Sequence, residues 1–497
     1  MFTLSISLWV TLVFIQVQIA VLISQHPKLL VVSYDGFRYD YLIRNLTPFM
    51  DGLKTNGTYA DYMKNIFITK TFPNHHSIMT GLYAETHGVV DNSVLDPDSG
   101  EMIKYSYKMF HYNEKISPIW TINEMANNGR RSGLMMWPGG HFKYQNIFPT
   151  YAQDLNISVS WEQRIDVLIS WFTDPISPIN FGVLYIEEPD LLGHAVGIHG
   201  DLFDKMLIKL DRITEYLHDQ LGRHGLTDVN VIHLSDHGME SVTLDRIINI
   251  TNYINDSDYK IIESPTTVHI YPKNGKEDLI YQKLAVVSNK TRHFNVYKRA
   301  NIPHEYHYGN NLRVGPIFVV ANLGYAFSSL YNFIPDYEKA YNFTVNNKSE
   351  FGLHGYDNKI KEMHPIFFAS GPAFQSKCKL EPFDSVDLLP LFCEVLNLSC
   401  PSVNGTLQHF RKCLKQSADI KSSTVIILAI VICALLILGG LGGVLVPHYI
   451  SKMKGHQRQS ISDPDMERLL EESASSDYVW RQKINYSILP NTNSNGL

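Results

Sequence analysis

Five short apolar runs, rich in β-branched residues and separated by segments of helical periodicity, constrain the fold of this chain most strongly. Runs of this length that are bounded by Gly, Pro, Asp or Asn are typical of strands buried on both faces of a sheet. Residues 201–221 repeat apolar side chains at helical spacing and would cover one face of such a sheet. The sequence therefore predicts an α/β fold around a parallel or mixed sheet. Its predicted strands are Leu29–Ser33, Gly133–Trp137, Phe181–Tyr185, Val229–Leu234 and Pro365–Ala369.

The composition excludes several classes of protein. The chain has 497 residues, of which 44% are hydrophobic and 19% charged, so it can bury a large core and is not globally disordered. Its net charge of -6 gives no basic surface for nucleic-acid duplex binding. Residues 241–350 are richer in Asn, Tyr and sequons than their surroundings, which predicts a lobe inserted into the core.

Two apolar stretches without charged side chains lie near the ends of the chain. Residues 5–24 have the character of a secretory signal peptide, and the lack of a preceding Lys or Arg leaves an uncleaved signal anchor as the alternative. Residues 424–446 form an uncharged run of 23, and about 20 residues cross a ~30 Å hydrocarbon core. The sequence predicts a signal peptide at 1–24, an extracellular domain at 25–421, a transmembrane helix at 424–446 and a disordered cytoplasmic tail at 447–497.

Sequons and cysteines support this orientation at the plasma membrane. Ten N-x-S/T sequons lie between the two apolar stretches and one, at Asn485, follows them. Four cysteines close to the span are placed to form two disulfides in an oxidising lumen. In the tail, a dileucine pattern at 465–470 and a tyrosine pattern at 486–489 predict sorting adaptors as partners and endosomal cycling, with an unrecognised solvated tail as the alternative. The predicted glycosylation sites are Asn45, Asn56, Asn156, Asn249, Asn255, Asn289, Asn342, Asn347, Asn397 and Asn404, and the cysteines are Cys378, Cys393, Cys400 and Cys413.

Carboxylate and imidazole side chains follow the predicted strands. Ligand sites of open α/β sheets lie beyond the carboxyl ends of the strands, so these side chains are candidates for one site. Asp236 and His237 are adjacent and share a site only if the chain turns, which Gly238 favours. Mixed Asp and His ligands suit zinc, and six or seven of them are too many for one tetrahedral centre, which implies two Zn²⁺ ions. The candidates are Asp35, Asp190, His194, Asp236, His237 and His354.

Thr71 is the candidate nucleophile for such a site. Pro73 and the helical pattern of residues 74–83 place Thr71 at a helix N-terminus, where free N–H groups favour an oxyanion. A two-metal site clamps the attacking and leaving oxygens of a phosphoryl displacement, so the arrangement predicts phosphoester chemistry. An N-cap threonine without a catalytic role is the alternative.

Six motifs in register resemble the ecto-nucleotide pyrophosphatase/phosphodiesterase family of the alkaline phosphatase superfamily, and in particular its short single-pass members, the fourth and the fifth. The resemblance runs from about residue 28 to 410 and implies an alkaline-phosphatase-like fold, in which a mixed, mostly parallel sheet has helices on both faces. The motifs are SYDGFR (33–38), FITKTFPNHHSIMTGLYAETHGVVDN (67–92), MWPG (136–139), LYIEEPDLLGH (184–194), SDHGM (235–239) and HGYDN (354–358).

The resemblance assigns roles to these residues. It implies that Thr71 forms a covalent phospho-threonine ester, that Asn92 donates to a phosphate oxygen, and that Phe72 packs on a nucleotide base. It divides the ligands between two zinc ions, with Asp35, Thr71, Asp236 and His237 on one and Asp190, His194 and His354 on the other.

Two departures from the family pattern bear on the substrate. Leu155 stands where nucleotide-cleaving relatives carry a base-stacking tyrosine, so Tyr151 is the candidate replacement, and Leu191 and Leu192 follow the metal ligand Asp190. The resemblance implies hydrolysis of extracellular nucleotides such as dinucleotides, NAD or ATP to nucleoside 5'-monophosphates. The alternatives are a choline or lipid phosphodiesterase, or a surface receptor or adhesion protein with weak or no catalysis.

Overall fold

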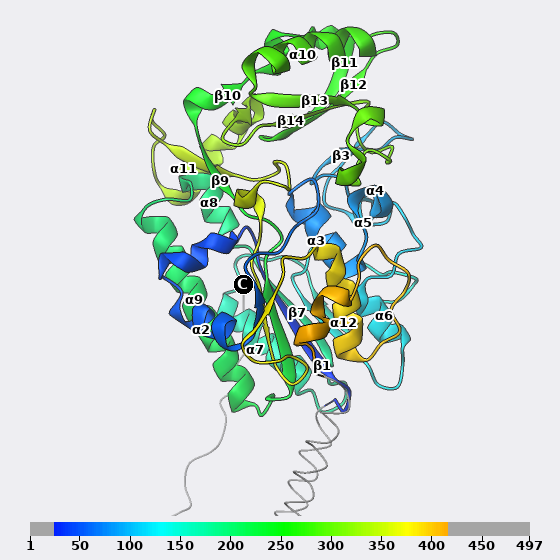
Figure 1. Cartoon of the computed structure of the whole chain (residues 1–497), viewed down its shortest axis with the longest axis vertical. Coiled ribbons are helices and arrows are strands. Elements are labelled where there is room, and N and C mark those ends of the chain that lie inside the picture. Colours follow the sequence, from blue (N-terminus) through cyan, green and yellow to red (C-terminus); the bar gives the residue numbers. More distant parts are fainter. Residues whose placement is uncertain (1–23, 416–497) are drawn as a thin grey trace, which may run out of the picture. The chain divides into compact units, whose positions relative to one another are not determined.

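The computed structural model describes residues 24–415, and these are built around an eight-stranded sheet (Figure 1). Its strand order is β18-β2-β17-β8-β1-β7-β5-β6. β17 is the one strand of this sheet that runs antiparallel to its neighbours, so the predicted mixed, mostly parallel sheet is confirmed. The strands are β1 (Lys28–Tyr34), β2 (Thr58–Ala60), β5 (Ser132–Met135), β6 (Tyr151–Gln153), β7 (Phe181–Ile186), β8 (Val229–Leu234), β17 (Phe367–Ser370) and β18 (Cys378–Leu380).

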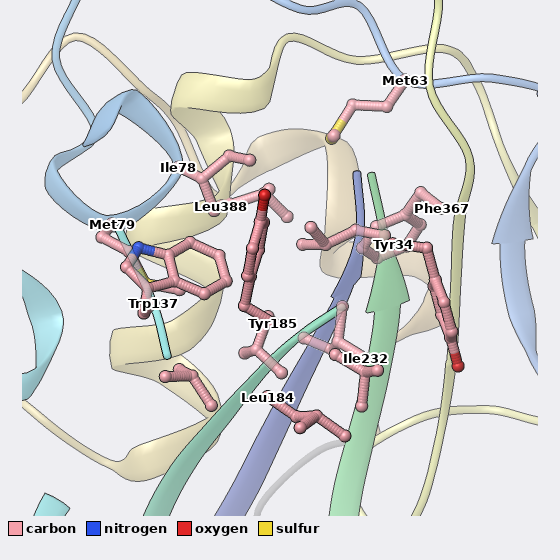
Figure 2. Packing of buried hydrophobic residues seen from close by; sticks show 14 of the residues in the cluster. Tyr34, Met63, Ile78, Met79, Trp137, Leu184, Tyr185, Ile232, Phe367 and Leu388 are labelled. Carbon is pink, nitrogen blue, oxygen red and sulfur yellow. The ribbon is translucent and has the colours of Figure 1, made fainter. Parts of the chain in front are cut away.

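The three central strands are buried along their whole length. β1 lies between β7 and β8 and runs parallel to both, and every residue of the three is buried, as their largely apolar character predicts. Figure 2 shows this core, in which Tyr185 of β7 lies among Trp137, Ile78 and Leu388. The sheet is thus covered on both faces.

Helices cover the two faces of the sheet (Figure 1). α9 follows the predicted pattern and presents Phe203, Leu207 and Leu210 to the core. It packs with α2 and α7, while α12 packs with α3 and α6 beside β1. These helices are α2 (Pro48–Asn56), α3 (Thr71–Thr80), α6 (Ile119–Met125), α7 (Trp161–Phe172), α9 (Asp201–Arg223) and α12 (Leu388–Leu396).

A second, antiparallel sheet occupies part of residues 241–350, in the strand order β11-β12-β14-β13. It has its own apolar core, which includes Val268, Ile280, Leu284 and Val319 from this sheet and α10. The elements are β11 (Tyr259–Glu263), β12 (Thr267–Pro272), α10 (Glu277–Thr291), β13 (Phe294–Lys298), β14 (Ile317–Ala321), α11 (Ile334–Tyr341) and β16 (Glu350–Leu353), which pairs with β9 (Glu240–Thr243). Shorter elements are β3 (Val94–Leu95), α4 (Ala84–His87), β4 (Met102–Ile103), α5 (Tyr107–Phe110), α8 (Asp190–Val196), β10 (Ile247–Ile248) and β15 (Ala326–Phe327).

The predicted signal peptide, apart from Ser24, lies outside the described residues, as do the transmembrane span and the tail patterns. Within residues 24–415, none of the helices combines the length and the apolar character that a membrane crossing requires. All ten predicted glycosylation asparagines lie at exposed positions of this part of the chain.

One of the two predicted disulfides is present. Cys378 of β18 is bonded to Cys413, 35 residues along the chain, whereas Cys393 and Cys400 are free thiols, so the prediction of a second disulfide is not met. The two free thiols form a hydrogen bond with each other. This hydrogen bond, together with burial, raises the pKa of Cys393.

Removing the Cys378–Cys413 bond is expected to destabilise the domain. A loop of 35 residues costs about 3 to 4 kcal/mol of closure entropy in the unfolded chain. We therefore expect the Cys378→Ser/Cys413→Ser double variant to lose about 3 kcal/mol of free energy of unfolding, measured by urea titration. Cys400→Ser, which leaves the bond intact, is the control, and equal stability of the double variant and the wild type would contradict the expectation.

Candidate metal-dependent active site

The acidic and imidazole side chains gather at the carboxyl ends of the three central strands. Asp35 directly follows β1, Asp190 begins α8 shortly after β7, and Asp236 and His237 follow β8. Because these strands are parallel neighbours, their ends meet at one edge of the sheet. His354 joins them from the segment after β16.

Two glycines allow this close approach. Gly238 lies against the backbone of Glu362, where a side chain would come within 2.1 Å of the carbonyl oxygen, so the chain turns tightly after His237. Gly36 has a φ of 70° and lies against Asp190, and a Cβ there would be 2.9 Å from the Asp190 Cβ. The turn expected at Gly238 thus brings Asp236 and His237 into one site.

Asp35, Asp236 and His237 form the first potential metal group. One ligand atom of each lies within 4.8 Å of the others. The His237 Nε2 is 3.3 Å from the Asp35 Oδ1 and 3.1 Å from the Asp236 Oδ2. The Thr71 Oγ is 3.4 Å from the same nitrogen, so the predicted nucleophile borders this group.

Asp190, His237 and His354 form the second group, again within 4.8 Å. The two Asp190 oxygens face different imidazoles, with His194 Nε2 at 3.2 Å and His354 Nε2 at 3.6 Å. The rings of His237 and His354 stack at 3.6 Å between centroids. The structure therefore brings all seven predicted ligands together, but it places His237 in both groups, where the family pattern gives it to one ion.

The donor atoms of these groups fit bound cations. Asp35 Oδ1, Asp190 Oδ1 and Asp236 Oδ2 are buried and accept no hydrogen bond. A buried carboxylate oxygen without a partner carries a large desolvation cost, which a cation offsets. Among residues 24–415, no other buried aspartate oxygen lacks a hydrogen-bond partner, and all three of these residues belong to the two potential metal groups.

The three imidazoles are oriented as metal ligands. Each Nδ1 bonds a backbone carbonyl, which can only accept, so Nδ1 carries the proton and Nε2 is left for the cluster. The acceptors are the carbonyls of Gly352 for His194, Gly238 for His237 and Thr69 for His354, at 2.7, 2.9 and 2.8 Å.

The carboxylates of the site differ strongly in acidity. Burial, together with the charges of Asp236 and Asp190, raises the pKa of Asp35 well above its ordinary value. Burial also favours the neutral form of Asp236, but electrostatic interaction with the His237 and His75 side chains outweighs it and lowers the pKa of Asp236 to about 2. Tyr185 donates a 2.5 Å hydrogen bond to the Asp35 Oδ2 and so fixes which oxygen faces the cluster.

Thr71 occupies the first turn of α3. The helix thus begins three residues before the helical pattern predicted for residues 74–83. Thr71 is 8% exposed and lies at the start of a helix in which all residues but Phe72 are buried. His75 holds the turn in place, because its Nδ1 bonds the Thr71 carbonyl at 2.9 Å and lies 3.3 Å from the Asp236 Oδ2. The Asn92 Oδ1 accepts from the Phe72 N–H at 2.9 Å, which leaves its amide protons free to donate.

An aromatic wall adjoins the nucleophile. The ring centroid of the half-buried Phe72 lies 5.3 Å from that of Tyr105, which is exposed. It lies 5.7 Å from the ring centroid of Phe110, which is buried. Tyr151, the predicted replacement for the missing tyrosine, instead stacks on Trp171 at 5.3 Å. Leu155 is 48% exposed. Tyr105 is therefore the ring that stands beside Phe72.

Comparison with known proteins decides the family. The model of the type I phosphodiesterase / nucleotide pyrophosphatase family matches residues 29–357. The chain belongs to this family. The match contains every residue of the two metal groups and Thr71, so the nucleotide pyrophosphatase/phosphodiesterase class of hydrolase, predicted from the sequence, is confirmed.

Several family members are similar over most of their length. Human ectonucleotide pyrophosphatase/phosphodiesterase family member 5 is 36% identical over 401 residues, which are 78% of each chain. Human bis(5'-adenosyl)-triphosphatase is 37% identical over 396 residues, 79% of this chain and 82% of the relative. The structure of an inactive threonine-to-alanine variant of murine member 5 in complex with AMP aligns with a TM-score of 0.70 at 39% identity, covering 78% of this chain and all of that one.

Three residues of this phosphodiesterase site were not predicted. Tyr185 lies in an apolar strand, where a tyrosine is indistinguishable from a core residue. His75 stands in the nucleophile motif, and its spacing of four from Thr71 on a helix is a signal for contact. Tyr105 lies between β4 and α5, in a segment whose path the sequence does not reveal.

Proposed function

We propose that the chain is a zinc-dependent ectoenzyme that cleaves phosphodiester or pyrophosphate bonds of extracellular nucleotides, dinucleotides foremost, and releases nucleoside 5'-monophosphates. One observation carries this proposal. The Thr71 hydroxyl lies at a helix N-terminus beside two overlapping Asp/His groups whose orphaned carboxylate oxygens call for cations.

Two Zn²⁺ ions are the proposed cofactors. Asp35, Asp236, His237 and Thr71 would hold one, and Asp190, His194 and His354 the other, with His237 close to both. Zinc bound there would neutralise phosphate charge and stabilise the attacking and leaving oxygens.

The chain's own residues then perform the displacement. The Thr71 hydroxyl loses its proton to solvent and its Oγ attacks the phosphorus, so that an Oγ–P bond forms while the bond to the leaving oxygen breaks and that oxygen keeps the electron pair. The Asn92 amide and the Thr71 backbone N–H donate to the phosphate oxygens as charge develops, since the Phe72 N–H already bonds Asn92 and Pro73 has no N–H. Water next cleaves the threonine ester, which releases the nucleoside monophosphate and restores the hydroxyl.

The aromatic wall and the relatives support a nucleotide as substrate. Phe72 directly follows the nucleophile, and together with Tyr105 it offers flat apolar faces to a base. A choline or glycerol group has no flat ring to use them. The relatives named bis(5'-adenosyl)-triphosphatase and the AMP complex of murine member 5 agree with this choice.

Tyr105→Ala is expected to weaken nucleoside recognition. Loss of one stacking partner costs about 1 to 3 kcal/mol, so kcat/KM for the p-nitrophenyl ester of thymidine 5'-monophosphate should fall about tenfold or more. Rates on p-nitrophenyl methyl phosphate, which has the same leaving group and no base, provide the reference. Tyr253→Ala removes a similarly exposed tyrosine from the other lobe and is the control. Equal losses on the two esters would exclude a base contact at Tyr105.

We also propose a location at the plasma membrane, with the catalytic domain outside. The exposed positions of the ten sequons support it, and the uncharged run at 424–446 supplies a single-pass anchor. Surface labelling and glycosidase digestion of the full chain test this location; a protein that is neither labelled nor shifted would contradict it.

The assay for the proposed function uses the purified full-length protein with diadenosine triphosphate. The expected products are AMP and ADP in equal amounts, and chromatography measures their formation. A folded, zinc-loaded protein that cleaves a choline phosphodiester and leaves the dinucleotide intact would overturn the proposal.

A further inference from the structure

The segment between α4 and β3 carries Asn92, and the inserted lobe bonds the backbone of this segment at two points. The Arg313 guanidinium donates a 2.9 Å hydrogen bond to the Gly88 carbonyl. The Tyr308 hydroxyl donates a 2.8 Å hydrogen bond to the Val90 carbonyl. Both donors are buried. The path of the chain into Asn92 therefore depends on a lobe that supplies none of the predicted metal ligands.

Asp91 continues this connection through its side chain, which is 4% exposed. Its Oδ1 accepts a 2.6 Å hydrogen bond from the Asn92 N–H and lies 3.5 Å from the Lys70 Nζ. Its Oδ2 accepts a 2.8 Å hydrogen bond from the Thr267 hydroxyl and lies 3.4 Å from the His269 Nε2, and both of these partners belong to β12. One carboxylate oxygen thus contacts the core, and the other contacts the lobe.

The protonation of the groups around Asp91 favours these contacts. The His269 Nδ1 accepts a 3.1 Å hydrogen bond from the Gly315 N–H, so Nε2 carries the proton and faces the carboxylate as a donor. Burial favours the neutral carboxyl, but the charge of Lys70 and the hydrogen bond from His269 outweigh it and lower the pKa of Asp91 below its ordinary value. Asp91 is therefore ionised at neutral pH, and hydrogen bonds to an ionised acceptor are about twice as strong as those between neutral groups.

Asn92 is held at its backbone and at its side chain. Its N–H bonds Asp91, and its Oδ1 accepts from the Phe72 N–H at the start of α3. We propose that Asp91 is a positioning residue of the reaction, through which the inserted lobe holds the Asn92 amide beside Thr71. This inference rests on the proposed function, in which the Asn92 amide donates to the phosphate as charge develops. The alternative is an ionic contact that only ties the lobe to the core.

Asp91→Asn tests the proposal on the full-length protein. An amide has one accepting oxygen, so it cannot accept from Asn92 on one side and from the lobe on the other. With the p-nitrophenyl ester of thymidine 5'-monophosphate, kcat is expected to fall by about tenfold or more while KM stays within about twofold, since the Asn92 contact strengthens only in the transition state. The metal content of the same preparation should equal that of the wild type.

A double-mutant cycle with Asn92→Ala separates positioning from a purely structural role. If Asp91 acts through Asn92, Asp91→Asn lowers kcat by about tenfold in the wild-type background and by less than about twofold when residue 92 is already alanine. Thr267→Val removes only the hydroxyl on the lobe side and repeats the cycle with a smaller disturbance of the fold. Its fall in kcat should likewise disappear in the Asn92→Ala background.

Asp387→Asn is the matched control. Asp387 is 3% exposed at the start of α12 and accepts from the Thr406 N–H and from the His409 ring, each at 2.7 Å, so it resembles Asp91 in burial and in partners. Its variant should keep the wild-type kcat. Equal falls in kcat for Asp91→Asn in both backgrounds, or no fall for Asp91→Asn and Thr267→Val alike, overturn the positioning role and leave the proposed function standing. A wild type inert on the thymidine ester and on diadenosine triphosphate refutes the proposed function itself, and the inference with it.

Discussion

Replacing Thr71 by alanine is expected to lower kcat on a nucleoside 5'-phosphodiester by a factor on the order of a thousand or more. The neighbouring hydroxyl cannot substitute for it. Thr69 donates to the Tyr356 carbonyl at 3.0 Å and accepts from the Gly355 N–H at 2.9 Å, so both functions of its hydroxyl are used. The measurement is the rate of p-nitrophenol release from the thymidine ester, beside metal analysis of the same preparation.

Two further variants make the Thr71 result specific. Thr71→Ser keeps a hydroxyl at the helix N-terminus and should retain measurable turnover. Thr80→Ala removes a buried hydroxyl that bonds the His76 carbonyl in the same helix and should keep wild-type turnover. A Thr71→Ala protein with substantial activity and a full metal content would contradict the nucleophile.

Removing metal is the second large effect that we expect. Without a cation, the buried Asp35 faces Asp236 and Asp190 across the site, and their mutual repulsion opposes catalysis and folding alike. Incubation with a chelator should lower the rate by a factor on the order of a thousand, and added zinc should restore it. The melting temperature should fall and recover in parallel, because a ligand that binds only the folded state stabilises it.

The control for metal removal is a variant in which one group is already weakened. Asp190→Asn removes the charge that faces both His194 and His354, and it should bind one metal ion fewer than the wild type. A wild type that keeps its full rate after chelation, with metal analysis showing an empty protein, would refute the metal-dependent account.

The central sheet was predictable because its strands are buried on both faces. β1, β7 and β8 are largely apolar runs, and the structure places each within one or two residues of its predicted position. The edge strands β2 and β18 have three residues each and give no such signal. β2 pairs with β17 and β18, which lie about 300 residues later in the chain, so the local sequence pattern does not predict this pairing.

The clustering of the candidate metal ligands was predictable for the same topological reason, since parallel strands bring their carboxyl ends to one edge of the sheet. The position of His237 in both Asp/His groups was not predictable, because it depends on the stacking of its ring on that of His354, a residue 117 positions later. A cavity beside the candidate metal ligands is lined by Lys70 of the core and by Phe333 and Tyr337 of the smaller lobe. Contacts between residues so far apart in the sequence depend on how the lobe packs on the core, which the periodicity of the sequence does not predict.

The most direct test of the account is to identify the residue that becomes covalently attached to the substrate. The full-length protein is mixed with diadenosine triphosphate, quenched in acid within milliseconds, digested and analysed by peptide mass spectrometry. An adenylyl group is expected on the peptide that contains Thr71 and is expected to be absent from Thr71→Ala. An adduct on another residue, or product formed at full rate with none on any peptide, would contradict the account.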